Sequence, residues 1–143
     1  MSEHIYELKS PFEYAHKGES IEAGFITLFA PTFKQIDKVA PIKQAFTAAI
    51  SEVTESVDTN QEVSDEESTV TGPQVMQLMY RWSGDMTTVF LHAEQLFKSG
   101  AALVDGETKL TSPLMEKMTL DDFEGVVGDY IANFIAPSLM AGQ

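Results

Sequence analysis

The sequence predicts an α+β fold that is mostly α-helical. An N-terminal β-hairpin or small sheet is followed by about four helices with a mobile acidic linker among them. Short β-rich segments with alternating polarity open the chain, and apolar residues then recur at spacings of three and four. We divide a single domain, residues 1–143, into a β-rich element at 1–32, a helix at 33–57, an acidic linker at 58–72 and a helical part at 73–143.

Two segments near the N-terminus are predicted to be strands. Ile5–Leu8 is short and β-rich, and Ser20–Phe29 alternates between polar and apolar positions. Gly24, inside the second segment, predicts a bulge or a close backbone approach, because glycine offers no side chain to pack. Pro31 ends the second segment.

The first helix is predicted to begin at Phe33, where apolar residues start to recur with helical spacing. Pro41 lies inside this pattern, and proline has no N–H and clashes with the carbonyl group four residues earlier. Such a helix must kink or restart, and we expect a restart with Pro41 in the first turn.

An acidic segment follows the first helix. Seven acidic residues and no basic residue lie between Glu52 and Glu67, so the stretch after Val57 has little apolar surface with which to offset the entropy of ordering. We predict a mobile linker. A solvated loop without a partner is one interpretation, and a docking segment for a basic partner is the alternative.

Pro73 is well placed to open a second helix. Ser83–Asp85 interrupts the pattern, either as a break with Asp85 as the N-cap of a third helix or as a kink in one long helix. The third helix should end near Gly100, where glycine can adopt a left-handed C-cap conformation.

Asp105 and Gly106 form the strongest hairpin signal in the chain, in the middle of Ala101–Leu110, although a tight reversal between helices would use the same residues. A short helical turn is expected after Pro113. The last helix is predicted to begin with Thr119 as its cap and two carboxylates in its first turn, and to end before Pro137.

Composition limits the classes of function. The chain has 9 Lys and Arg against 22 Asp and Glu, a net charge of −13 and a pI near 4.4. Such a charge repels phosphate backbones and anionic lipids, so we expect no nucleic-acid or membrane partner. There is no cysteine, which excludes disulfides and thiolate sites. No signal peptide and no apolar span of membrane length is recognisable, so we expect a cytoplasmic protein.

Candidate catalytic and metal-binding residues find a simpler explanation in each case. His92-Ala93-Glu94 matches the H-x-E of zinc deaminases, but the paired cysteines of such sites are missing. His4 and His16, with a glutamate, could bind a metal weakly if the first hairpin brought them together. A carboxylate cluster at the start of the last helix is explained by the helix dipole; its members are Glu116, Asp121, Asp122 and Glu124.

No motif for a phosphate-binding loop or an activated nucleophile is present. We therefore predict a protein that is not an enzyme and uses no cofactor and no metal. Aromatic residues and methionine are frequent in binding surfaces, although most must fill the core. A helix face wide enough to serve both roles would support an oligomer or a binding groove. The candidate partner-binding residues are Phe90, Phe97, Phe123, Val127, Tyr130 and Phe134.

Both ends of the chain resemble tail assembly chaperones of long-tailed bacteriophages. The similarity begins with the cadence Tyr6-x-Leu8-x-x-Pro11, continues through Tyr14–Gly18 and Ile21, and reaches Pro31-Thr32. Near the other end it comprises Lys109-Leu110-Thr111, Leu114–Met118, Asp121-Asp122-Phe123 and a helix ending near Phe134. The stretch from Glu52 to Gly72 departs from this pattern and looks like an insertion.

The resemblance implies a non-catalytic protein in the host cytoplasm that binds the tape measure protein, keeps its long helices soluble and helps to recruit tail tube subunits. It also implies a longer frameshifted product. Two alternatives remain open from the residues. One is a structural virion component such as a tail terminator or connector subunit. The other is an acidic inhibitor that mimics DNA, which would need a rigid carboxylate array.

Overall fold

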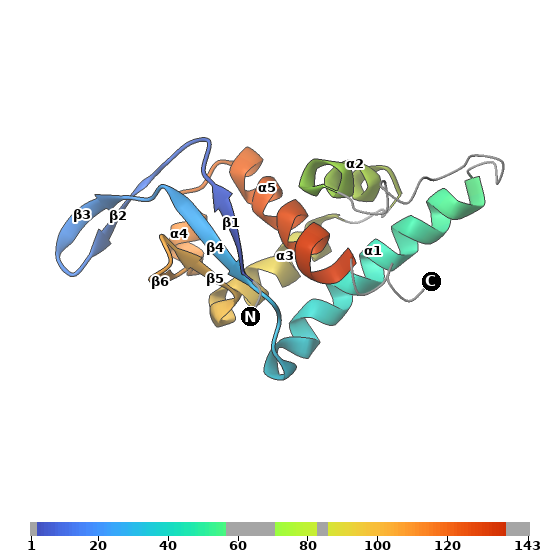
Figure 1. The fold of residues 1–143 in the computed structure, drawn as a ribbon, viewed down its shortest axis with the longest axis horizontal. Helices are drawn as coiled ribbons and strands as arrows, with labels where there is room; N and C mark the ends of the chain where they lie inside the picture. Colours follow the sequence, from blue (N-terminus) through green and yellow to red (C-terminus); the bar gives the residue numbers. More distant parts are fainter. Residues whose placement is uncertain (1–2, 57–70, 83–85, 137–143) are drawn as a thin grey trace.

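The computed structural model describes residues 3–56, 71–82 and 86–136, with side chains for all but residues 52–56 and 82. The fold is α+β, as predicted, with a small antiparallel sheet followed by helices (Figure 1). The four-stranded sheet has the order β1-β4-β5-β6. Its strands are β1 (Glu3–Glu7), β4 (Phe25–Phe29), β5 (Ala102–Val104) and β6 (Thr108–Lys109). A separate hairpin consists of β2 (Glu13–His16) and β3 (Glu19–Glu22) and projects beyond the end of the sheet.

The long helices are α1 (Ile36–Ser56), α2 (Gly72–Trp82), α3 (Met86–Leu96) and α5 (Leu120–Tyr130). Shorter turns are η1 (Phe33–Gln35), η3 (Phe97–Ala101), α4 (Ser112–Met115) and η4 (Ile131–Ile135). Helix α2 packs against α5 and α1, α1 also packs against α3, and α5 runs alongside β1 (Figure 1). The predicted acidic linker, apart from Thr71 and Gly72, and the interruption at Ser83–Asp85 lie outside the described residues.

The predicted strand Ser20–Phe29 is divided into β3 and β4 at Ala23 and Gly24. Strand β4 pairs with β1 along its whole length, whereas β3 pairs only with β2. Side-chain hydrogen bonding explains the division, because the Asp105 carboxylate accepts bonds from the backbone N–H groups of Gly24, at 2.9 Å, and Phe25, at 3.3 Å. A carboxylate from the far half of the chain thus sets where the strand begins.

The predicted hairpin around Asp105 and Gly106 is confirmed. Both residues have positive φ, 53° and 77°, and the N–H of Glu107 donates to the carbonyl of Val104 at 3.0 Å. Positive φ at both central positions is the geometry of a type I′ turn. The hairpin is more than a reversal between helices, since β5 pairs with β4 and extends the N-terminal sheet. Gly100, at the end of η3, has a φ of 115°, as its C-cap position predicted.

The expected restart at Pro41 is wrong, because α1 runs through this residue. The helix is started further upstream by Thr32 and Gln35, whose backbone and side-chain groups form a capping box at η1. Beyond Pro41 the helix is held by core contacts, with Ile42 and Phe46 each 1% exposed. One missing backbone hydrogen bond therefore does not interrupt the helix, because tertiary packing outweighs the local preference.

Two glycines determine how closely α5 approaches its neighbours. A Cβ atom added at Gly125 would lie 2.3 Å from the Tyr6 hydroxyl, and one at Gly128 would lie 2.6 Å from the carbonyl oxygen of Gly72. Because neither glycine has a side chain, β1 and the start of α2 can pack directly on the α5 backbone. One cluster of buried residues then extends from Tyr6 to Ala136.

Candidate partner-binding site

Five of the six predicted partner-binding residues form a continuous row of aromatic contacts between α3 and α5. Ring centroids are 5.6 Å apart for Phe90 and Phe123, and 6.2 Å apart for Phe123 and Phe97. The row continues from Phe97 to Tyr130 at 5.7 Å and from Tyr130 to Phe134 at 4.9 Å. The first three pairs are edge-to-face, an arrangement that adds about 0.5–1.5 kcal/mol each beyond the buried area, and the Tyr130–Phe134 pair is tilted. Three of these contacts join α3 and η3 to α5.

The structure places these residues at different depths. Phe97, Val127 and Tyr130 are each 1% exposed and belong to the core, so they present no surface to a partner. Phe90, Phe123 and Phe134 are half-buried. Burial raises the pKa of Tyr130 well above its ordinary value, and its hydroxyl has no hydrogen-bond partner among the described residues. The row is therefore partly accessible at both ends, at Phe90 and Phe123 and at Phe134, and closed in between.

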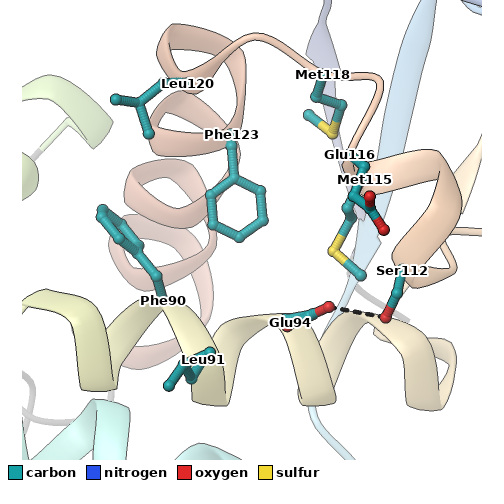
Figure 2. A pocket seen from close by; sticks show the side chains of 9 residues that line it. All are labelled: Phe90, Leu91, Glu94, Ser112, Met115, Glu116, Met118, Leu120 and Phe123. Atoms are coloured by element: carbon teal, nitrogen blue, oxygen red, sulfur yellow. Dashed lines mark hydrogen bonds between the residues drawn. The ribbon is translucent and has the colours of Figure 1, made fainter.

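A pocket of about 330 Å³ lies beside the end at Phe90 and Phe123, between α3, α4 and the start of α5 (Figure 2). Phe90 and Phe123 face each other on one side of it, and the thioethers of Met115 and Met118 lie on the other. Leu91, 57% exposed, and Leu120, 65% exposed, stand at its mouth. The remaining lining residues are Glu94, Ser112 and Glu116. We name this site the α3–α5 pocket.

Sequence reasoning missed Leu91, Leu120 and the two methionines. Leu91 lies off the apolar stripe of its helix, and Leu120 is the first residue of α5. Large apolar side chains exposed at the mouth of a mostly apolar pocket are typical of binding sites, and methionine adapts its shape to different ligands. The arrangement can hold a bulky apolar group without directing it through hydrogen bonds.

Acidic groups accompany the apolar lining of the pocket. Glu94 accepts a hydrogen bond from the hydroxyl of Ser112 at 2.7 Å, and Glu116 is exposed. Glu94 is the glutamate of the H-x-E sequence, and in the structure its carboxylate contacts Ser112 on α4. The ring of Tyr80 contacts that of Phe90, with centroids 6.4 Å apart, and its hydroxyl donates to Glu124. Burial, together with this hydrogen bond and the charge of Glu124, raises the pKa of Tyr80 to about 12, so its hydroxyl remains a donor.

Asp122 is the main polar residue whose role the sequence did not reveal. Its carboxylate is 0% exposed and accepts hydrogen bonds from the Tyr6 hydroxyl and from the backbone N–H groups of Lys9 and Ser10, each at 2.9 Å. Its own N–H donates to Thr119, which confirms the predicted cap. Burial by itself would raise the pKa of this carboxyl, but hydrogen bonds from Lys9, Ser10, Tyr6 and Thr119 outweigh it and lower the pKa below 3.8.

Two further aspartates tie the N-terminal strands to the rest of the chain. Asp129 accepts a hydrogen bond from His4 Nε2 at 2.9 Å, and Asp105 accepts one from the Tyr14 hydroxyl at 3.2 Å. His16 lies instead beside Thr108, at 3.2 Å from its hydroxyl. His4 and His16 therefore have separate partners, contrary to the pairing considered from the sequence. No group of His, Asp or Glu side chains suited to a metal ion occurs in the described part of the chain.

Comparisons with protein-family models, with curated proteins and with solved structures found no match. Among the described helices, none combines the length and the apolar character needed to cross a membrane. The α3–α5 pocket is therefore the feature of the structure that bears most directly on function.

Proposed function

We propose that this protein is a non-enzymatic tail assembly chaperone that binds the tape measure protein in the cytoplasm of the infected host. The observation that supports this proposal is the α3–α5 pocket, in which apolar side chains stand exposed beside carboxylates. A chaperone of this kind must bind apolar helix faces whose sequences vary along a long partner. Methionine and aromatic walls suit such a task, because they adapt to different side chains.

Size and charge define the ligand of the pocket. A cavity of about 330 Å³ accommodates one or two large apolar side chains, as presented by one turn of an amphipathic helix. Glu94 and Glu116 favour Lys or Arg beside those side chains, and the net charge of −13 attracts basic segments over a longer range. The ligand is therefore an amphipathic helical segment of the tape measure protein with basic residues flanking its apolar stripe.

The test is co-expression with the tape measure protein encoded in the same genome, followed by pull-down and a solubility assay. Leu91→Asp combined with Leu120→Asp places two carboxylates at the mouth of the pocket. Both positions are more than half exposed, so the variant should fold. We expect it to lose at least about tenfold in affinity, which corresponds to about 1.4 kcal/mol, and to leave the tape measure protein insoluble.

The matched control is Phe33→Asp combined with Ile36→Asp, which replaces two apolar side chains in η1 and at the start of α1 that are also more than half exposed. This control should bind within about twofold of the wild type, because surface changes away from a site have small effects. Equal binding by both double variants would refute the pocket as the binding site. Absence of any complex, with the protein present in purified virions at fixed stoichiometry, would favour the virion-component alternative.

A further inference from the structure

The outer face of the sheet carries apolar side chains that do not belong to the core. Directly paired residues point to the same face, so Ile5, Thr27 and Leu103 form a row across β1, β4 and β5. Phe25 and Phe29 lie on the same face of β4, on either side of Thr27. Ile5 is 53% exposed, and Phe25, Phe29 and Leu103 are half-buried. We name this surface, made of Ile5, Phe25, Phe29 and Leu103, the outer sheet patch.

The opposite face of the sheet packs into the hydrophobic core. Tyr6, Ile26, Leu28 and Val104 point inward and are at most 9% exposed. In the described part of the chain, the half-buried members of the outer sheet patch are not among the hydrophobic residues packed against the core. Among the members of the outer row, only Thr27 is buried, at 3% exposed.

The sequence of β4 is typical of a strand that is covered on both sides. An antiparallel strand with one solvated face alternates between apolar and polar residues, whereas β4 reads Phe-Ile-Thr-Leu-Phe without such alternation. One layer covers its inner face, and the outer face lacks a second layer within the described residues. An apolar sheet face is stable when another layer packs against it.

Charged residues around the patch indicate which partner fits. Lys109 on β6 is paired with Leu103, so it continues the row of Ile5, Thr27 and Leu103 to the far edge of the sheet. On β1, Glu3 and Glu7 lie on the same face, one on each side of Ile5. The patch therefore has two carboxylates along one edge and an ammonium group at the middle of the other.

We propose that the outer sheet patch is a dimer interface between two copies of this chain. A two-fold axis parallel to the strands, between β4 and β5, places β1 of one copy opposite β6 of the other. Packed sheets lie about 10 Å apart, a gap that opposing side chains span. Lys109 of each copy then lies between Glu3 and Glu7 of the other copy. Positive and negative charges therefore meet across the two-fold axis, and the face is complementary to a second copy of itself.

This interface is independent of the α3–α5 pocket, because the two surfaces share no residue. The patch is small, and the net charge of −13 on each copy opposes association, so the dimer belongs to the weak end of specific interfaces. It should form at micromolar to millimolar concentrations at physiological ionic strength.

The experiment is sedimentation equilibrium of the full chain with three variants. Lys109→Glu alone, and Glu3→Lys combined with Glu7→Lys, each oppose like charges and should weaken the dimer at least tenfold. An equimolar mixture of the two variants restores both sets of opposite charges and should associate at least as tightly as the wild type. Glu19→Lys combined with Glu22→Lys on β3 changes the net charge equally and should not associate with Lys109→Glu in this way.

Replacement of Ile5 tests the apolar part of the interface. Ile5→Thr keeps a β-branched residue in the edge strand, so β1 should still form, and circular dichroism checks that it folds. We expect the variant to be monomeric at concentrations where the wild type is a dimer. A wild type that remains monomeric at about 1 mM, or a mixture that fails to restore association, would overturn the proposal. The proposal would also be overturned if the wild type were monomeric and Ile5→Thr lost tape measure binding. That result would assign the patch to the tape measure protein.

Discussion

Two neighbouring residues of α5, Asp122 and Phe123, belong to regions of opposite character. Asp122 is 0% exposed, and its carboxylate accepts three directional hydrogen bonds. Phe123 is half-buried, touches Phe90 and Phe97 and lines the α3–α5 pocket. One side of the same helix turn is therefore fixed to the N-terminal strands, and the other side remains accessible.

The difference shows how a small domain combines a rigid frame with an adaptable site. Hydrogen bonds to a buried carboxylate require particular distances and angles, so the Asp122 junction allows one arrangement of β1, the following loop and α5. Apolar contacts are not directional, so the pocket tolerates different side chains of similar volume. Stability and binding should consequently respond to different substitutions.

The largest expected effect is that of Asp122→Ala. It leaves the Tyr6 hydroxyl and the N–H groups of Lys9 and Ser10 without their acceptor, and we expect a loss of about 3 kcal/mol or more in the free energy of unfolding. Urea denaturation measures it. The control is Asp121→Ala at the preceding position, whose ion pair with Lys9 is 3.5 Å long and mostly exposed. It should cost less than about 0.5 kcal/mol. Similar losses for the two variants would contradict the comparison.

A second, smaller effect is the pH dependence of the same junction. The folded-state pKa of Asp122 lies below its ordinary value of 3.8, so in acid the folded state binds fewer protons than the unfolded state. This stabilisation is present above the ordinary pKa and is lost as the pH falls through the lowered pKa. The stability difference between the wild type and Asp122→Asn should therefore shrink as the pH falls below about 4. A difference that grows in acid would contradict the assigned hydrogen bonds.

The smallest effects on stability are expected at the mouth of the pocket. Leu91→Ser and Leu120→Ser should each change the free energy of unfolding by no more than about 0.5 kcal/mol, because both side chains are largely exposed. Leu96→Ser, in the same helix as Leu91 but 0% exposed, should cost about 3 kcal/mol. Thermal unfolding of the three variants makes the measurement. A large loss at Leu91 would show that the pocket serves the fold.

Local patterns were sufficient wherever a feature depends on residues close together in the chain. The Asp105-Gly106 turn, the Thr119 cap and the positive φ of Gly100 are confirmed, because each follows from the conformational preference or hydrogen bonding of a few neighbouring residues. Pro41 was the exception. Its local preference was outweighed by the capping box upstream and by the packing of Ile42 and Phe46 downstream.

The candidate site could be predicted only in part. Helical spacing identified Phe90 and Phe123, but the same spacing selected Phe97, Val127 and Tyr130, which the core encloses. An apolar stripe gives the direction in which a residue points, and its depth depends on what packs there. Leu91 and Leu120 were missed for the same reason, since only the meeting of α3, α4 and α5 makes them the mouth of a pocket.

By itself, the sequence determined the α+β class, the strongly acidic character and the local turns and caps, because periodicity, composition and turn chemistry act over short distances along the chain. Only the tertiary structure decided that Asp105, Asp122 and Asp129 hold the N-terminal strands across separations of 80 to 125 residues. The tertiary structure alone also decided which aromatic side chains remain accessible. The sequence does not distinguish a carboxylate that faces water from one that accepts a hydrogen bond from a buried N–H group, because the N–H group is brought to it only by folding.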